Sequence, residues 1–387
     1  MLYFRTSKRH LMEVMLLGTL LAFVITYAAI PVIIKVAEIK KLYDIPNDRK
    51  VHAFPVPSLG GLGIFAGFII ACLLTISVNS AQGFQYYFAA AFVIFFVGLK
   101  DDILVLTPMK KIIGQVIAAF IIIYKGGVVI KSMHGFLGVQ ELPEAIGLAL
   151  TYLTVIVVIN SFNLIDGVDG LAAGLGIFTT LCFGVYFYID TQFQYAALSF
   201  AMSGSLLAFL IFNRSPARIF MGDTGSLLIG LINAILVIRF INTAGATGAA
   251  MSFKACPAIA VAVLIVPLFD TLRVFSIRIF NRRSPFSPDR NHIHHILLDR
   301  GMNHKTVSLT LIMTNIFFVA LAYTLRHLNI NLVISILVVC AFGAFAIIYY
   351  RKPATMLVTN EHGDIIQINS HSLIIPLTPA KKVAEQN

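Results

Sequence analysis

Charged residues are what this sequence has least of for its length. Only 12% of its 387 residues are Asp, Glu, Lys or Arg, whereas 58% are hydrophobic. Soluble globular proteins carry about 25% charged residues. This composition therefore excludes a soluble globule as the main body of the chain.

Cysteine is also scarce, and its placement excludes two classes of site. The four cysteines lie inside or near apolar segments, and no two of them have a C-x-x-C spacing. They are expected to act as small core hydrophobes and not as disulfides or zinc ligands. The string His292-Ile-His294-His295 could bind zinc, but no cysteine or further clustered ligand completes a tetrahedral site. The chain also lacks the G-x-x-x-x-G-K-[ST] pattern of a P-loop.

The chain is rich instead in long apolar runs. About 20 apolar residues suffice to cross a bilayer as a helix. The first run, Leu16–Val36, is too long for the core of a signal peptide, so we expect a retained helix. Eleven runs are candidate spans: 12–36, 60–78, 84–99, 111–124, 146–161, 171–189, 195–212, 224–240, 257–278, 306–325 and 329–350.

These runs predict an all-α polytopic integral membrane protein with about eleven transmembrane helices. Residues 1–352 would form the transmembrane domain, and residues 353–387 a polar tail. Two short apolar stretches of the tail, Met356–Asn360 and Ile365–Ser370, are compatible with a β-hairpin.

The basic residues predict the orientation of these helices. The formal net charge is +11, and roughly two thirds of the 29 Lys and Arg residues fall in the odd-numbered loops and the C-terminal tail. By the positive-inside rule those loops are cytoplasmic and the N-terminus is external, although Arg5, Lys8 and Arg9 oppose this orientation. Because the basic residues flank apolar helices, no nucleic-acid partner is expected.

The acidic residues have an unusual distribution. Carboxylates beside hydrocarbon are costly unless a cation or another partner neutralises them. Their gathering in loops of one side therefore predicts a site for a divalent cation and a phosphorylated substrate. Seven of the 18 acidic residues lie at the ends of apolar segments in these loops: Asp101, Asp102, Asp166, Asp169, Asp223, Asp270 and Asp289.

The loop near residue 165 carries the strongest local pattern. Asn160, Asn163 and Asp166 are spaced by three, so on a helix they share one face. Gly167 and Gly170 allow close approach of the backbone to a ligand. A turn that caps the next helix would explain Asp169 but not the two asparagines.

Three further segments allow a structural interpretation beside the functional one. Asp101 and Asp102, followed by Lys110 and Lys111, could be a solvated turn or could hold a cation. Asp223, within FMGDTGS, could cap a helix whose N-terminus also suits a phosphate.

The third of these segments is the basic region that follows residue 269. Asp270 and Arg273 could form a simple ion pair. The arginines and histidines that follow suit diphosphate or sugar recognition.

The strings GLKDD, NxxNxxDGxDGLA, FMGDTGSLLIG and SPFSPDRNHIHH occur in this order between the apolar segments. Together they resemble the polyprenyl-phosphate N-acetylhexosamine-1-phosphate transferase superfamily, glycosyltransferase family 4, from about Asp44 to Gly301. The DIPNDRKVH loop and the HIHH string resemble the bacterial undecaprenyl-phosphate N-acetylglucosamine-1-phosphate transferases, which initiate O-antigen, teichoic acid and related glycans. The phospho-MurNAc-pentapeptide transferases share the aspartate motifs but differ in the last loop.

This resemblance implies the reaction and the roles of the residues. A lipid phosphate would attack the sugar-proximal phosphate of a UDP-sugar, with release of UMP. Asp223 would bind Mg²⁺, for which Mn²⁺ could substitute, and Asp101 would be the disputed candidate base. Phe220 would stack on uracil. Catalytic roles are implied for Asp101, Asp102, Asn163, Asp166 and Lys111. Substrate contacts are implied for Lys110, Gly167, Asp169, Asn213, Phe220, Arg278, His292, His294 and His295.

The expected partners are a UDP-N-acetylhexosamine, undecaprenyl phosphate and the bilayer of the bacterial cytoplasmic membrane, with the active site facing the cytoplasm. A homodimer is left open, as are the identity of the N-acetylhexosamine and the MurNAc-pentapeptide reaction. A membrane transporter is the alternative from another class. It is disfavoured because the carboxylates lie at one rim and not near the midplane of the membrane.

Overall fold

The computed structural model describes residues 2–44, 56–76, 83–245, 253–284, 291–350, 355–359 and 365–369. Two features singled out in the sequence lie outside these ranges. They are the basic stretch with Arg49, Lys50 and His52, and the acidic residue Asp289.

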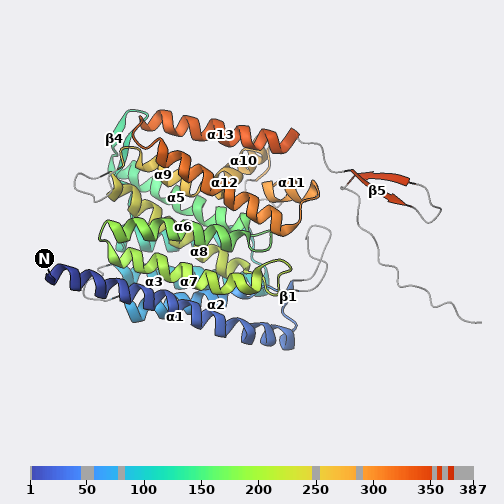
Figure 1. Ribbon diagram of the computed structural model, residues 1–387, viewed down its shortest axis with the longest axis horizontal. Coiled ribbons are helices and arrows are strands. Elements are labelled where there is room, and N and C mark those ends of the chain that lie inside the picture. The colour runs from blue at the N-terminus through green and yellow to red at the C-terminus, as the bar shows by residue number, and fades with distance from the viewer. Residues whose placement is uncertain are drawn as a thin grey trace, which may run out of the picture.

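Long helices that run side by side make up most of this part of the chain (Figure 1). A helix satisfies its backbone hydrogen bonds internally, which is the condition for crossing hydrocarbon. The first helices are α1 (Leu2–Lys40), α2 (Gly60–Thr75), α3 (Phe84–Leu104), α4 (Pro108–Phe120) with its π-helical extension η2 (Ile121–Lys125), α5 (Glu144–Ile165) and α6 (Leu171–Ile189). The others are α7 (Phe193–Asn213), α8 (Gly222–Ala244), α9 (Cys256–Val263), α10 (Ile265–Phe280), α11 (Ile293–Asp299), α12 (His304–Thr324) and α13 (Ile330–Tyr350).

Each of the eleven predicted apolar segments falls on a helix, and the all-α polytopic fold is confirmed. Within the described residues, seven helices are long and apolar enough to cross a membrane, or up to eight if α9 and α10 count as one span. Helix α2 is a shorter apolar helix. The total of eleven spans therefore stays a prediction.

The ninth segment differs from its prediction as one helix over 257–278. It consists of α9 and α10, which are bent by 80° at Leu264. The buried side chain of Asn315 in α12 bridges this break. Its Oδ1 accepts from Val266 N at 3.1 Å, and its Nδ2 donates to Val263 O at 2.9 Å. Backbone groups freed by a broken helix need such partners within a membrane.

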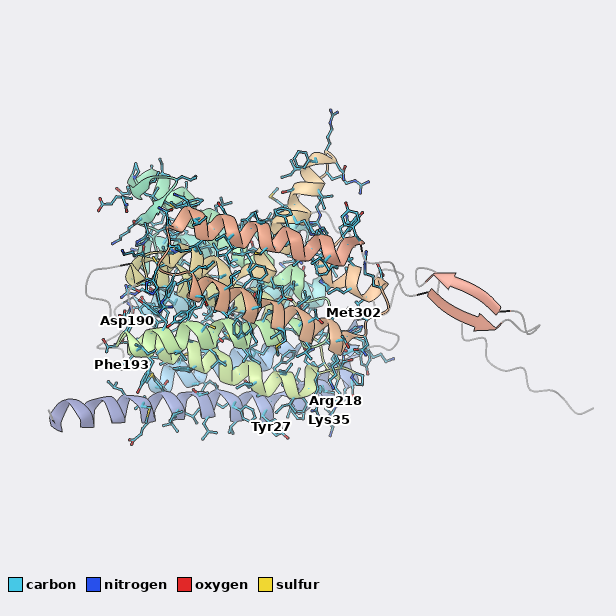
Figure 2. The ribbon with its side chains drawn as sticks, turned by 45° about the horizontal axis from the view of Figure 1, so that its top comes forward. Tyr27, Lys35, Asp190, Phe193, Arg218 and Met302 are labelled. Atoms are coloured by element: carbon cyan, nitrogen blue, oxygen red, sulfur yellow. The ribbon has the colours of Figure 1, made fainter. Side chains whose placement is uncertain are left out.

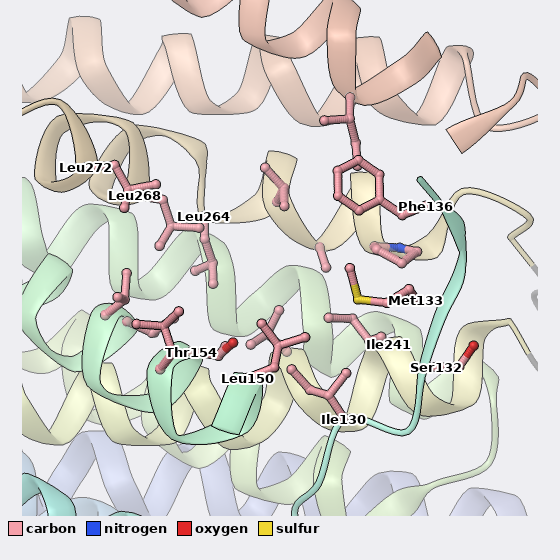
Figure 3. A pocket seen from close by; sticks show the side chains of 18 residues that line it. Ile130, Ser132, Met133, Phe136, Leu150, Thr154, Ile241, Leu264, Leu268 and Leu272 are labelled. Atoms are coloured by element: carbon pink, nitrogen blue, oxygen red, sulfur yellow. The ribbon is translucent and has the colours of Figure 1, made fainter. Parts of the chain in front are cut away.

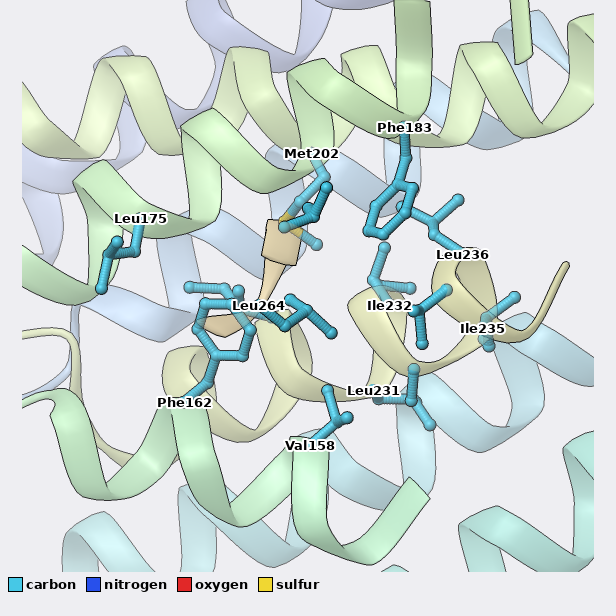
Figure 4. Packing of buried hydrophobic residues seen from close by; sticks show 14 of the residues in the cluster. Val158, Phe162, Leu175, Phe183, Met202, Leu231, Ile232, Ile235, Leu236 and Leu264 are labelled. Atoms are coloured by element: carbon cyan, nitrogen blue, oxygen red, sulfur yellow. The ribbon is translucent and has the colours of Figure 1, made fainter. Parts of the chain in front are cut away.

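Helix α8 lies at the centre of the bundle. The most apolar stretch of α8 is 89% buried, against 17% for α13 at the edge. Large side chains of α5 and α6 pack around it, among them Phe162 and Phe183 (Figure 4). Gly61 of α2 lets its backbone approach α8, because a Cβ there would lie 2.2 Å from Gly225 N. The glycines that open α2 thus serve helix packing.

Three antiparallel strand pairs complete the described structure. They are β1 (Tyr43–Asp44) with β2 (Val56–Pro57), β3 (Ser132–Phe136) with β4 (Val139–Glu141), and β5 (Thr355–Thr359) with β6 (Ile365–Asn369).

The loops sort to two ends of the bundle. The β3–β4 hairpin lies at the end opposite β1 and α11 (Figure 1). Likewise Asp190 and Phe193 lie at one end, whereas Arg218 and Met302 lie at the other (Figure 2). The end that holds α11 is called the motif end below, because the sequence motifs gather there.

Candidate active site

An ion-pair network centred on Lys111 joins three helices at the motif end. The Lys111 Nζ lies 2.6 Å from Asp101 Oδ2 and 2.7 Å from Asp223 Oδ2. Asp101 comes from the last turn of α3, Lys111 from the first turn of α4, and Asp223 from the start of α8. Asp101 Oδ1 also accepts from Leu106 N at 2.5 Å, which ties the carboxylate to the α3–α4 turn. Two aspartates that are more than 110 positions apart in the chain thus share one lysine ammonium group.

Asp102 occupies the N-terminus of α8. Its Oδ1 accepts from Asp223 N at 2.7 Å, and its Oδ2 accepts from Thr224 N at 3.1 Å and Thr224 Oγ1 at 2.6 Å. Burial raises the pKa of Asp102 to about 7 despite these donors. The sequence had offered Asp223 as the cap of this helix, and its free amides as a phosphate site. In the structure Asp102 caps the helix and uses these amides.

Asn163 connects α5 to the same network. Its Nδ2 donates to Asp223 Oδ1 at 2.9 Å and to Ser226 Oγ at 3.0 Å. One turn deeper, Asn160 Nδ2 donates to Gln115 Oε1 of α4 at 2.7 Å. The helical spacing of the two asparagines therefore serves two different partners on one side of α5.

Asp166 directly follows α5 as its C-terminal cap residue. Burial, together with the charges of Asp223 and Asp102, raises the pKa of Asp166 well above its usual value. Burial and the Asp223 charge also raise the pKa of Asp101. Among the described residues, Lys111 is the one cation paired with any of these four carboxylates. Four carboxylates therefore crowd around a single lysine, and an additional cation would relieve the repulsion between them.

The donor atoms of this cluster fit Mg²⁺ in kind. They are carboxylate and amide oxygens, which hard cations prefer. No group of three or more His, Cys, Asp or Glu side chains in the described ranges could hold a metal ion on its own. Mg²⁺ commonly binds through one or two carboxylates together with substrate phosphates and water, so a preformed cage is not required.

Asp169 joins the α5–α6 loop to two other segments. Its carboxylate lies 3.4 Å from His304 Nδ1 of α12 and accepts from Ala217 N at 3.2 Å. Burial alone would raise the pKa of Asp169, but the hydrogen bond and charge of His304 and the donation from Ala217 lower it. The Asp169 carbonyl accepts from Ser308 Oγ at 2.7 Å.

Asn213 and Phe220 flank the loop between α7 and α8. The buried Asn213 amide donates to Ile219 O and accepts from Gly170 N, both at 2.9 Å. Phe220 is half-buried, and its backbone pairs with Pro57 and Gly60 near the start of α2. The predicted nucleotide residues Asp169, Asn213 and Phe220 thus gather on two adjoining loops.

A polar groove of about 630 Å³ opens beside Asp169. Arg214, Arg218 and Lys305 line it together with apolar residues of α7 and α12, so its charge is positive. Lys110 is exposed near the start of α4, and its side chain has no hydrogen bond or ion pair within the described part of the chain.

Asp270 forms a second buried carboxylate centre, in α10. It is 1% exposed, and its Oδ1 lies 2.9 Å from Arg273 Nη2, the pair that the sequence suggested. The same Oδ1 accepts from Ile293 N at 2.9 Å, and Oδ2 lies 2.8 Å from His292 Nδ1. Arg278 is buried at the end of α10, near the ring of Phe275.

His294 links α11 to the α5–α6 loop. It is 1% exposed, and neither ring nitrogen has a hydrogen-bond partner within the described residues. Burial and the neighbouring His295 lower the pKa of His294 to about 3. A Cβ at position 167 would lie 2.4 Å from His294 Nε2, so Gly167 leaves the space that the imidazole fills. His292 and His294 also stack in parallel, with ring centroids 5.6 Å apart.

An apolar groove of about 370 Å³ lies between α5 and α10 (Figure 3). Leu150 and Thr154 of α5 face Leu264, Leu268 and Leu272 across it (Figure 3). It reaches Ser132 and Phe136 of β3 at the end of the bundle opposite the motif end. Its walls suit a hydrocarbon chain.

The structure thus brings most of the predicted site residues together and adds several that the sequence did not indicate. His304 and Gln115 were missed because each is an isolated polar residue outside the motifs, and Thr224 was missed although it directly follows Asp223 within FMGDTGS. Their partners are far away in the chain, so no local spacing could reveal them. The role of Asp270 at His292 was missed for the same reason.

Comparison with known proteins identifies the family of this chain. Residues 84–241, from α3 into α8, match the model of glycosyl transferase family 4. The decaprenyl-phosphate N-acetylglucosaminephosphotransferase of Mycobacterium leprae is 33% identical over 329 residues, which are 80% of this chain and 82% of the relative.

Two further relatives agree with this match. The probable undecaprenyl-phosphate N-acetylglucosaminyl 1-phosphate transferase of Bacillus subtilis is 32% identical over 312 residues, covering 79% of this chain and 84% of the relative. The undecaprenyl-phosphate alpha-N-acetylglucosaminyl 1-phosphate transferase of Yersinia pestis is 30% identical over 288 residues, covering 73% and 76%. Because the matched region holds the helices that carry Asp101, Asn163 and Asp223, the chain belongs to glycosyl transferase family 4.

Proposed function

We propose that this protein transfers N-acetylglucosamine 1-phosphate from UDP-N-acetylglucosamine to undecaprenyl phosphate. The products are UMP and a polyprenyl-diphosphate-linked sugar, the starting unit of a cell-envelope glycan. The reaction takes place at the cytoplasmic face of the bacterial cytoplasmic membrane. The names of the relatives support N-acetylglucosamine and a polyprenyl-phosphate acceptor, which is undecaprenyl phosphate in two of them and decaprenyl phosphate in the third.

One observation carries the proposal, which is the sharing of Lys111 by Asp101 and Asp223 beside Asn163 and Asp166. Phosphoryl transfer needs in-line positioning and stabilisation of developing charge, with little covalent chemistry from the protein. A half-buried group of carboxylates around one lysine would supply these requirements for a lipid-borne phosphate.

The two substrates approach from different phases. We assign the apolar groove between α5 and α10 to the prenyl chain, because Leu264, Leu268 and Leu272 give it an almost entirely apolar lining. The uridine is assigned to the loops that hold Asp169, Asn213 and Phe220, where the half-buried Phe220 ring would stack on uracil. The sugar and diphosphate are assigned to Arg278 and the histidines of α11.

Asp223 and Asp166 are the residues that would hold Mg²⁺ or Mn²⁺. When bound, the ion would neutralise charge on the diphosphate and polarise its oxygens. Lys111 donates to one oxygen of the Asp223 carboxylate, and Asn163 donates to the other, so the carboxylate is held from two sides. The charge excess among these carboxylates is the feature of the chain that supports a cation.

The reaction balances without a covalent enzyme intermediate. An oxygen of the lipid phosphate attacks the sugar-proximal phosphorus, and the bond from that phosphorus to the UMP oxygen breaks. Lys111 would stabilise negative charge on the transferred phosphoryl group. Asp101 is positioned by Leu106 N and Lys111, and it would take the proton if the lipid phosphate enters as the monoanion.

Purified protein in detergent, supplied with undecaprenyl phosphate, Mg²⁺ and one UDP-sugar at a time, tests the proposal. UMP release and the mass of the lipid product are measured. UDP-N-acetylglucosamine should give stoichiometric UMP and a lipid heavier by one N-acetylglucosamine 1-phosphate. Preference for UDP-MurNAc-pentapeptide or for another UDP-N-acetylhexosamine would replace the sugar assignment. Uptake of a solute into vesicles without UMP release would favour a transporter.

A further inference from the structure

We propose that Asp270 is a positioning residue for use of the sugar donor, because it fixes both the ring of His292 and the start of α11. The inference rests on the proposed transferase function. Asp270 lies in α10, outside the matched family segment and away from the Lys111 network. Asp270 would touch no substrate itself. It would act through His292, which it contacts, and through His294, which follows in α11.

The geometry around Asp270 is that of an orienting carboxylate. The side chain is almost completely buried, and three donors surround it: Arg273 Nη2 and Ile293 N on Oδ1, and His292 Nδ1 on Oδ2. A guanidinium and a backbone amide on one oxygen stabilise the ionised form. The acceptor to His292 is therefore a carboxylate.

The charge of this carboxylate determines the state of the imidazole. A carboxylate can only accept, so the proton of a neutral His292 must lie on Nδ1 and its Nε2 must be an acceptor. The neutral ring donates from Nδ1 to Asp270, so its Nε2 is free to accept a hydrogen bond from a sugar hydroxyl.

Asp270 also holds the element that carries the next histidine. Its bond to Ile293 N anchors the first residue of α11, and His294 follows one position later. His294 fills the space above Gly167, the neighbour of Asp166. Close contacts thus lead from Asp270 through α11 to Gly167 in the α5–α6 loop.

The Asp270→Asn variant separates orientation from packing. The asparagine Oδ1 can still accept from Ile293 N and Arg273. Its Nδ2 can only donate to His292 Nδ1, which moves the proton of the neutral ring to Nε2. We expect kcat/KM for UDP-N-acetylglucosamine to fall about 10- to 100-fold, the usual effect of losing an orienting partner. The KM for undecaprenyl phosphate should stay unchanged. The variant should stay folded with a lower thermal midpoint, because Arg273 loses its charged partner.

The matched control is Asp190→Asn. Asp190 accepts from Gln192 Nε2 at 2.6 Å and lies at the end of the bundle opposite Arg218 and Met302 (Figure 2). The same chemical change at that end should leave kcat/KM for UDP-N-acetylglucosamine and the KM for undecaprenyl phosphate unchanged. A comparable loss in Asp190→Asn would mean that replacing an aspartate by asparagine lowers activity wherever it is placed, and would overturn the inference.

A double-mutant cycle tests whether Asp270 acts through His292. In the His292→Ala background, Asp270→Asn should lower kcat/KM for UDP-N-acetylglucosamine less than about threefold, because there is no imidazole left to orient. A loss of kcat/KM in the double variant that equals the product of the two single losses would overturn the inference. Equal effects on the donor and on the lipid phosphate, or a collapsed thermal midpoint in Asp270→Asn alone, would do the same.

A spectroscopic readout keeps this inference distinct from the transferase proposal. Histidine ¹⁵N chemical shifts, with the His292 signal assigned by its loss in His292→Ala, report the tautomer without any turnover. We expect the Nδ1–H form in the native protein and the Nε2–H form in Asp270→Asn. If the native protein transfers no sugar phosphate, the transferase proposal fails, and these shifts still decide the role of Asp270. An Nε2–H tautomer in the native protein would overturn that role.

Discussion

Lys111 and Lys110 are neighbours in the sequence but have different surroundings in the structure. Lys111 lies between Asp101 and Asp223, whereas Lys110 is exposed. Successive residues of a helix point about 100° apart, so only one of two adjacent lysines can face the aspartates. The sequence predicted that this pair belongs to the site, but the choice between them depends on how α4 is rotated against α3 and α8.

The Asp223→Asn variant should abolish transfer and leave the protein folded. The amide oxygen can still accept from Asn163, but it carries no charge for Lys111 or for a divalent cation. Losing one electrostatic group of this kind typically lowers kcat about 10²- to 10³-fold. UMP release is the measurement, with Asp190→Asn as the matched control. Near-normal turnover of Asp223→Asn in Mg²⁺ would remove Asp223 from the metal site.

The buried His294 predicts a loss of stability in acid. The pKa of His294 is lowered to about 3 in the folded protein, whereas an unfolded histidine titrates near 6.5. The unfolded state therefore binds the proton first, so this contribution to stability is present above pH 6.5 and is lost as the pH falls towards 3. The slope is up to about 1.4 kcal/mol per pH unit.

Thermal midpoints of the native protein and of His294→Gln, measured from pH 7.5 down to 4.5, check this expectation. The native midpoint should fall more steeply, because glutamine has no proton to take up. Parallel curves would mean that His294 is protonated without cost in the folded state.

How much of the site the sequence could predict depends on the reach of each interaction. Asn163 and Asp166 are local to one motif, and their joint placement was predictable from their spacing. A catalytic role was implied for Asp102, but its capping of α8, whose first residues lie 121 positions away in the chain, could not be read from any local spacing. The pairing of His304 with Asp169 has the same long-range origin, and no local pattern marks it.

At the scale of elements, the break between α9 and α10 shows what hydropathy cannot reveal. The segment 257–278 is apolar apart from Asp270, Arg273 and Arg278 near its end, so its hydropathy predicted one straight helix. Pro267 lies in the first turn of α10, where a missing N–H is tolerated. The partner of the break is Asn315, 49 residues beyond Val266. The sequence could predict a helix here but not its bend.

Asn315→Leu should destabilise the protein strongly. The substitution keeps the size of the side chain but leaves Val266 N and Val263 O without their partner. Each buried unsatisfied group costs about 1–3 kcal/mol, which gives about 2–6 kcal/mol in total. Unfolding in a detergent–denaturant series is the measurement.

The matched control is Asn233→Leu in α8. The Asn233 amide is fully buried but donates only to Ile229 O of its own helix, and its Oδ1 has no partner within the described residues. Its replacement should cost less than about 1 kcal/mol. Equal losses in the two variants would show that Asn315 does not support the break.

At the scale of the whole molecule, the two ends of the bundle should lie on opposite sides of the membrane. The β3–β4 hairpin lies at one end, and α11 with the start of α12 at the other (Figure 1). The distribution of Lys and Arg assigns the end with α11 to the cytoplasm. The all-α polytopic architecture followed from composition alone, whereas the number of spans depends on short helices such as α2 and α4.

Cysteine labelling can test this orientation. In a chain without native cysteines, a membrane-impermeant thiol reagent added to intact spheroplasts should modify Glu141→Cys in β4. It should not modify Lys305→Cys in α12. Both positions are exposed in the structure, so access and not burial decides the outcome. Modification of both from the same side would contradict the predicted topology.

The central position of α8 has a consequence for biosynthesis. The helices that pack on it most closely, α2, α3, α5 and α6, all precede it in the chain and reach the membrane earlier. The packing surface of these four helices is therefore complete only after α8 has been made. Because Asp223 begins α8, Lys111 gains its second carboxylate at that stage. A nascent chain that stops before α8 holds Asp101, Lys111 and Asn163 without Asp223, and we expect no transfer from it.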